Sequence, residues 1–133
     1  MQYRTDKKSG NELSLLGFGC MRFHRSMGAI VQDEATALVH EAIEAGVNYF
    51  DTAYIYPGSE AALGAALSGG WREKVFIADK LPLFLVKTAA DFDKTLEKSL
   101  ERLKTDRIDY YLMHMLTSPE FWERLRGLGI EKC

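Results

Sequence analysis

The sequence predicts an α/β fold built on a parallel sheet. Short apolar runs typical of strands alternate with longer stretches of helical periodicity, and this alternation repeats four times. Successive strand segments lie roughly 30 residues apart, which is the length of one strand–helix–strand unit. Such an order implies parallel strands joined by right-handed crossovers. The 133 residues suit one domain, which we assign to 1–133.

The first elements lie in the N-terminal quarter of the chain. Residues 1–14 are polar and carry turn residues at 9–11, which predicts a short β-hairpin. The apolar, glycine-rich run 15–19 is predicted as the first strand of the sheet. A loop is expected from about Met21 to Gln32.

The next elements are two helices and the strand between them. Asp33 is the predicted N-cap of a helix whose apolar residues recur at intervals of three and four, and Gly46 is predicted to end it. Residues 47–51 are the predicted second strand. A second helix is predicted over 59–67, because small apolar residues line one side and two glycines follow.

The second half of the chain repeats the pattern. Residues 75–80 are predicted as a strand that Pro82 ends. A helix over about 89–104 has acidic residues at its start and basic residues at its end, which suits the helix dipole. Residues 108–113 form the fourth predicted strand, and Pro119 is expected to start a fourth helix.

The composition bears on partners and location. The chain is 47% hydrophobic and 27% charged, with a formal net charge of -2. Acidic and basic residues are interspersed, so neither nucleic acid nor an anionic membrane is expected as a partner. No segment has the pattern of a signal peptide or a membrane span, so a cytoplasmic location is expected. Cys20 and Cys133 form no CxxC pair, and both are expected to be reduced thiols.

Four chemically active side chains fall at or near the predicted strand ends. Asp51, Lys80 and His114 each come at the end of a strand segment, and Tyr56 follows Asp51 by five residues. In a sheet of βα units the carboxyl ends of parallel strands form one rim, so these side chains are expected to converge. A phenol is a poor acid at neutral pH, and a nearby ammonium group makes it a better proton donor. The set therefore predicts a site that polarises a carbonyl group and protonates its oxygen.

The same residues resemble the motifs of the aldo-keto reductase family. The similarity lies in residues 16–22 (LGFGCMR), 50–60 (FDTAYIYPGSE), 75–80 (VFIADK) and 107–114 (RIDYYLMH). Residues 52–60 further resemble bacterial members that carry a C-terminal iron–sulfur segment, whose cysteines have no counterpart here. The resemblance covers essentially the whole chain.

This resemblance implies a (β/α)8 TIM barrel and an NADPH-dependent oxidoreductase that reduces an aldehyde or ketone to an alcohol. It assigns Tyr56 as the proton donor, Lys80 and Asp51 as its activators, and His114 as the residue that orients the substrate. Together with Asp51, the loop residues Gly19, Cys20 and Met21 are implied to lie at the nicotinamide end of the cofactor. The implied partner is a small carbonyl substrate.

The chain departs from the family pattern in length. It holds about four βα units after the hairpin, so we expect a truncated chain, the N-terminal half of a barrel, with weak or absent NADPH binding. Two alternatives stay open: a non-catalytic half barrel that serves in assembly or binding, and a metal site built from Asp51, Tyr54 and His114. A half barrel is also expected to form a homodimer or to pair with a second half barrel. Asp79, where the family often has a small polar residue, is expected to point away from the rim and have a modest effect.

Overall fold

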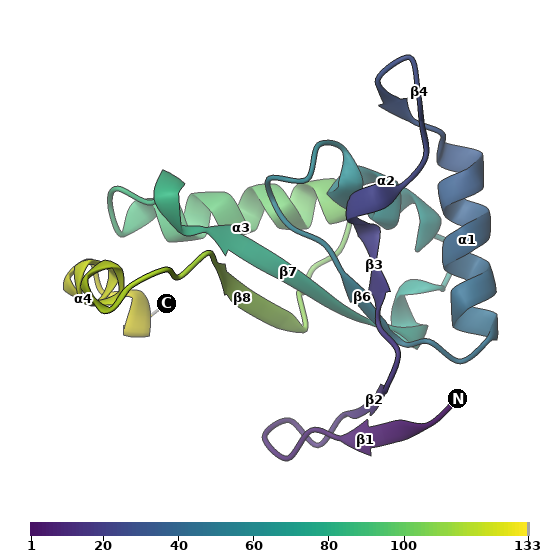
Figure 1. Ribbon diagram of the computed structural model, residues 1–133, viewed down its shortest axis with the longest axis horizontal. Coiled ribbons are helices and arrows are strands. Elements are labelled where there is room, and N and C mark those ends of the chain that lie inside the picture. The colour runs from purple at the N-terminus through teal and green to yellow at the C-terminus, as the bar shows by residue number, and fades with distance from the viewer. Residues whose placement is uncertain (133) are drawn as a thin grey trace.

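A parallel sheet forms the centre of the molecule. The computed structural model describes residues 1–132, and Cys133, with its predicted thiol, lies outside them. The strands follow the order β3 (Phe18–Gly19), β6 (Tyr49–Asp51), β7 (Phe76–Pro82) and β8 (Tyr110–His114). Strands that are neighbours in this sheet are also consecutive in the chain, apart from the small hairpins, and all three pairs are parallel (Figure 1). The predicted parallel α/β architecture is confirmed.

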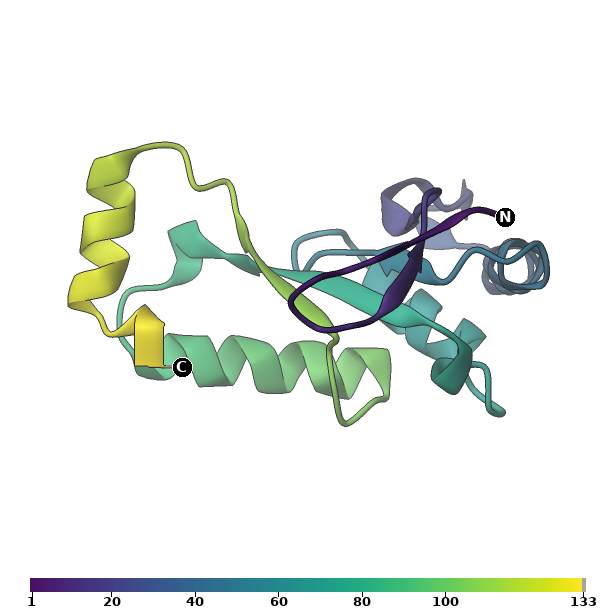
Figure 2. The same ribbon diagram turned by 90° about the horizontal axis from the view of Figure 1, so that it is seen from below.

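One face of this sheet is covered by α1 (Gln32–Glu44), α2 (Ser59–Ala66) and α3 (Ala90–Leu103). The helix α4 (Pro119–Gly127) follows β8. Single turns of 3-10 helix occur at Cys20–Arg22, Arg72–Lys74, Leu83–Leu85 and Ile130–Lys132. Seen from below, α3 runs along the sheet, whereas α4 lies beyond the far end of β8 (Figure 2).

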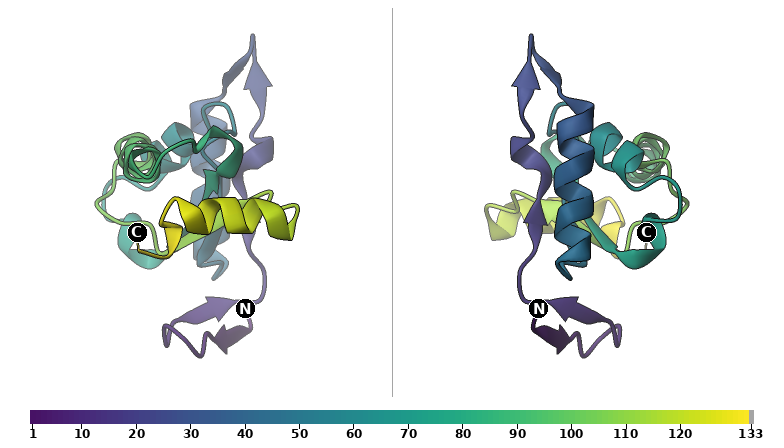
Figure 3. Two further views of the ribbon diagram at one scale, coloured as in Figure 1. Left: turned by 90° about the vertical axis from the view of Figure 1, so that its left-hand side faces the viewer. Right: turned by 90° about the vertical axis from the view of Figure 1, so that its right-hand side faces the viewer.

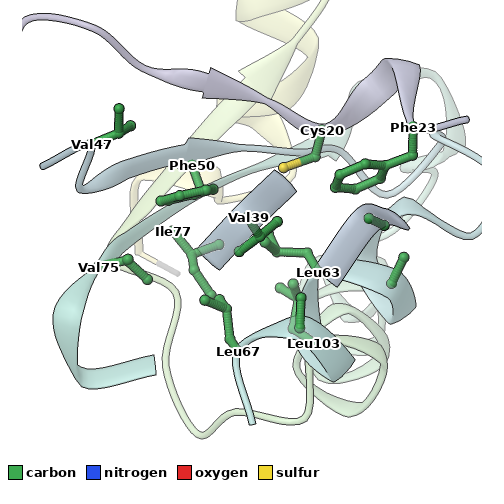
Figure 4. Packing of buried hydrophobic residues seen from close by; sticks show 13 residues of the cluster. Cys20, Phe23, Val39, Val47, Phe50, Leu63, Leu67, Val75, Ile77 and Leu103 are labelled. Carbon is green, nitrogen blue, oxygen red and sulfur yellow. The ribbon is translucent and has the colours of Figure 1, made fainter. Parts of the chain in front are cut away.

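The main core fills the space between the sheet and its helices. Phe50 and Ile77 point from the strands toward Val39 of α1, Leu63 of α2 and Leu103 of α3, all of them buried (Figure 4). A second cluster joins α4 to the segment after β7 and to α3, and comprises Leu81, Leu83, Val86, Phe92 and Leu125. The first three helices are therefore fixed to the sheet by burial of apolar surface.

Two small hairpins project from opposite ends of the sheet (Figure 3). The predicted N-terminal hairpin is confirmed as β1 (Tyr3–Thr5) and β2 (Glu12–Ser14). A second hairpin, β4 (Arg25–Ser26) and β5 (Ala29–Ile30), lies in the region predicted as a loop. Its two turn residues, Met27 and Gly28, both have positive φ, as a tight two-residue hairpin turn requires.

Several element boundaries differ from the prediction, and three of these differences have a clear structural origin or bear on the site. The first strand is shorter than 15–19, because Leu15 N donates to Gln2 O in the hairpin and both leucines at 15 and 16 are exposed. Asp33 does not cap α1; the N-cap position is Val31, and no side chain bonds there. Pro82 belongs to β7 as its last residue, so Lys80 lies two residues before the strand end.

Exposed apolar side chains cluster on β8 and the segment after it, at Tyr111, Leu112, Met113, Met115 and Leu116. On β8, Leu112 points to the side of the sheet that lacks helices, whereas Tyr111 and Met113 alternate to the side of Asp79 and the helices. Phe50 and Ile77 do not contribute to this open face, since both are buried against the helices. β3 and β8 are the outer strands of the sheet, so each has one unpaired edge.

We therefore expect the isolated chain to self-associate through β8 and its exposed neighbours. Sedimentation velocity at micromolar concentration should show species larger than the 15.0 kDa chain. Leu112→Lys should shift the distribution toward the monomer, whereas Leu38→Lys on α1, a similarly exposed leucine, should not. A compact native monomer that melts cooperatively would contradict this expectation.

Candidate functional site

The carboxyl ends of the strands bring the predicted side chains together. Asp51 is the last residue of β6, and His114, the last residue of β8, is in register with the last residue of β7. Tyr56 lies in the loop 52–58, which connects β6 to α2. Parallel strands end at one rim, so residues more than 60 positions apart become neighbours there.

Lys80 is the centre of this group. Its Nζ atom donates to Asp51 Oδ1 at 2.5 Å and to the Thr52 carbonyl oxygen at 2.7 Å. The same ammonium group lies 5.1 Å from the centroid of the Tyr56 ring. The side chain of Lys80 is 15% exposed, so its charge is largely shielded from water and acts strongly on its neighbours.

His114 faces Tyr56 across the rim. The two rings meet edge to face, with their centroids 5.9 Å apart. Burial, followed by the positive charge of Lys80, lowers the pKa of His114 below its ordinary value. The imidazole is therefore neutral at neutral pH and can donate one hydrogen bond without carrying charge. Its Nδ1 atom is buried and has no hydrogen-bond partner within residues 1–132.

The loop after β3 lies beside this group. Gly19 has open space above its α-carbon, and Met21 is half exposed. Cys20 instead turns its side chain into the core, where burial raises the pKa of its thiol. The predicted role of Cys20 near a cofactor therefore cannot involve its sulfur.

Two hydroxyl groups, which the sequence reasoning did not assign to the site, tie its loops together. Ser59 Oγ donates to the Cys20 carbonyl oxygen at 2.9 Å and, since its proton is used there, accepts from Thr52 Oγ1 at 2.8 Å. Both side chains are fully buried. Thr52 and Ser59 flank the loop that carries Tyr56, so they join that loop to the one after β3. In the sequence Thr52 is an ordinary residue after a strand and Ser59 an ordinary helix start, so no local pattern marks either.

A metal site finds no support in this geometry. The ring of Tyr54 stacks on the guanidinium group of Arg102, 4.4 Å from its centroid, on the helix side of the loop. Tyr54 therefore does not join Asp51 and His114 as a ligand. In the part of the chain that the structure describes, no group of three or more His, Cys, Asp or Glu residues could hold a metal ion.

Comparisons with protein-family models and with curated proteins identify one protein family. A model described as the aldo/keto reductase family matches residues 15–122. L-galactose dehydrogenase from Arabidopsis thaliana is 32% identical over 123 residues, which is 86% of this chain and 38% of that protein. The chain thus spans less than half the length of this curated relative.

Over residues 1–132, no helix is long and apolar enough to cross a membrane.

Solved structures agree with the sequence comparison. A putative aldo-keto reductase from Pseudomonas aeruginosa is 31% identical, with a TM-score of 0.74 over 97% of this chain and 56% of that one. An aldo-keto reductase from Bacillus halodurans, solved in its holo form, is 32% identical, with a TM-score of 0.71 over 98% of this chain and 46% of that one. The assignment to the (β/α)8 barrel fold, of which four βα units are present, is confirmed.

Proposed function

This chain belongs to the aldo/keto reductase family, and from that premise we propose that it serves the NADPH-dependent reduction of an aldehyde or ketone to an alcohol. Members of the family are oxidoreductases and generally bind NADP(H). The observation that carries the proposal is the position of Lys80, whose ammonium group is held by Asp51 beside the ring of Tyr56.

In this proposal Tyr56 is the proton donor. Its Oη atom gives a proton to the carbonyl oxygen of the substrate as that oxygen gains negative charge. The ammonium group of Lys80 stabilises the phenolate that remains, and Asp51 and the Thr52 carbonyl oxygen fix the ammonium in place. Because Lys80 is mostly buried, water screens this stabilisation only partly.

His114 orients the substrate. As a neutral imidazole it donates a hydrogen bond to the carbonyl oxygen and directs that oxygen toward Tyr56. The neutral form matters, because an imidazolium beside Lys80 would place two positive charges in one shielded site. The lowered pKa of His114 therefore keeps this orienting role available through the neutral pH range.

The residues at the rim suit the nicotinamide end of the cofactor. Gly19 and Met21 are uncharged and accessible, and Asp51 lies next to them on β6. When bound, NADPH supplies the hydride that adds to the carbonyl carbon, while Tyr56 supplies the proton. The non-catalytic half barrel, the other possibility from the sequence, is not favoured, because the match to an oxidoreductase family extends across the residues of the site.

We expect the isolated chain to bind NADPH weakly, because the family resemblance assigns most phosphate contacts to the half of the barrel outside these residues. Fluorescence titration should give saturable binding with a dissociation constant weaker than about 10 μM, or roughly -7 kcal/mol. Tyr56→Phe should bind NADPH equally well, since the hydroxyl acts on the substrate. Weaker binding by Tyr56→Phe than by the native chain would contradict the role proposed for its hydroxyl, and a constant in the low-micromolar range or tighter would contradict the expected weakness.

A further inference from the structure

Behind the proposed site, on the other side of β7, lies a cluster of three buried polar side chains and one partly exposed arginine. We call Glu60, Asp79, Ser99 and Arg102 the buried polar cluster. Asp79 and Lys80 are adjacent on β7, so strand alternation sends Lys80 toward Tyr56 and Asp79 toward α2 and α3. The loop that carries Tyr56 therefore has the proposed site on one side and this cluster on the other.

Arg102 connects the cluster to that loop. From α3, its Nη1 atom donates to Glu60 Oε2 at 2.7 Å and to the Tyr54 carbonyl oxygen at 3.3 Å. Its guanidinium group also stacks on the Tyr54 ring. Tyr54 and Glu60 lie on either side of Tyr56 in the chain, so one side chain holds the loop both before and after the proton donor.

The charges of the cluster do not balance when both acids are ionised. Glu60 is 2% exposed and Asp79 is fully buried, and within the described residues Arg102 forms an ion pair with Glu60 but none with Asp79. Glu60 Oε1, both carboxyl oxygens of Asp79 and Ser99 Oγ have no hydrogen-bond partner in the described chain. A buried, unpaired carboxylate beside a second one is costly, and one proton removes the excess charge.

We propose that Arg102 and Glu60 are positioning residues for Tyr56, and that Asp79 must carry a proton for them to hold the loop. This inference rests on the role proposed above for Tyr56. Burial first, and then the charge of Glu60, raise the pKa of Asp79 to about 7. The other groups facing Asp79 are Ser99 of α3 and Tyr111 of β8. Burial raises the pKa of Tyr111, so this phenol stays neutral and leaves Asp79 as the group that titrates.

Ionisation of Asp79 should therefore repel the Glu60 carboxylate and loosen the hold of Arg102 on the loop. The test uses the full chain with 13C-labelled tyrosine, in which the NMR signal that is missing from Tyr56→Phe identifies Tyr56. In the native chain that signal should shift between about pH 6 and about pH 8, with a midpoint near the pKa of Asp79, about 7. A Tyr56 signal that is constant over this range would overturn the inference.

Two variants test whether this pH-dependent step in the Tyr56 signal comes from the cluster. Asp79→Asn keeps the shape of the side chain and removes its titration, so the step should vanish. Glu60→Gln removes the neighbouring charge, so the midpoint should fall to lower pH. His114 titrates below its ordinary pKa, so any step due to that residue should remain in both variants. A step that both variants leave at the native midpoint would overturn the inference.

Amide hydrogen exchange tests the part played by Arg102. The Tyr56 amide donates to the Ala53 carbonyl oxygen at 2.9 Å, so its exchange rate reports on the order of the loop. Arg102→Gln should speed this exchange about tenfold, and Arg102→Lys should restore part of the protection. Arg126→Gln, which removes an exposed pair on α4, should have no effect. Equal exchange in Arg102→Gln and the native chain would overturn the inference, and none of these measurements depends on NADPH or a carbonyl substrate.

Discussion

Replacement of Tyr56 by phenylalanine is expected to lower the rate of carbonyl reduction about 10²- to 10⁴-fold, the range for loss of a positioned proton donor. The phenylalanine ring keeps the contact with His114, whose centroid lies 5.9 Å away, and loses only the hydroxyl. Substrate affinity should change little, because His114 still orients the carbonyl oxygen. The effect should therefore fall on kcat and leave KM nearly unchanged.

The measurement is NADPH oxidation with a panel of small aldehydes, confirmed by detection of the alcohol product. Protein concentrations should be high enough for the expected self-association. Tyr3→Phe serves as the control, since the Tyr3 hydroxyl bonds the Gly46 carbonyl oxygen at the opposite end of the sheet. A Tyr56→Phe rate within twofold of the native rate, or a native chain without turnover, would contradict the proposal.

The arrangement of the rim could be predicted because it depends on few features of the sequence. Strand-like runs that end near Asp51 and His114, with helices between them, place both at one end of a parallel sheet. Glycine at 46 marked the end of α1 correctly, since its φ of 92° is the left-handed conformation that a helix terminus often needs. Local signals of this kind determine where strands and helices end, and tertiary packing does not change them.

Other features depend on contacts between distant residues, which no local pattern encodes. The pairing of Arg102 with Glu60 spans 42 positions and arises from the packing of α3 against α2. The sequence also does not show which face of the sheet carries Phe50 and Ile77. Strands of a parallel sheet are apolar on both sides, so alternation does not distinguish the two faces. Cys20 turns inward because a 3-10 turn follows β3 and changes the direction of its side chain.

The contact between α2 and α3 predicts a large effect of a substitution at Gly64 on stability. Gly64 of α2 lies so close to the end of α3 that a β-carbon there would be 2.4 Å from the Leu103 carbonyl oxygen and 2.8 Å from its Cα atom. These are backbone atoms, so the clash cannot be relieved by a change of rotamer, and the two helices would have to move apart. Alanine favours a helix over glycine by about 1 kcal/mol, but overpacking of this kind typically costs about 1–3 kcal/mol and occasionally more.

We therefore expect Gly64→Ala to lower the free energy of unfolding by roughly 3 kcal/mol, since the obstacle is backbone. Urea unfolding, followed by circular dichroism at one fixed protein concentration, measures the difference. Gly127→Ala is the matched control: this glycine also lies in a helix, but no atom comes within 4 Å of the added carbon. It should be neutral or stabilising by up to about 1 kcal/mol. Because both substitutions add the same methyl group to a helical glycine, a Gly64→Ala chain as stable as Gly127→Ala would show that α2 and α3 do not pack through this contact.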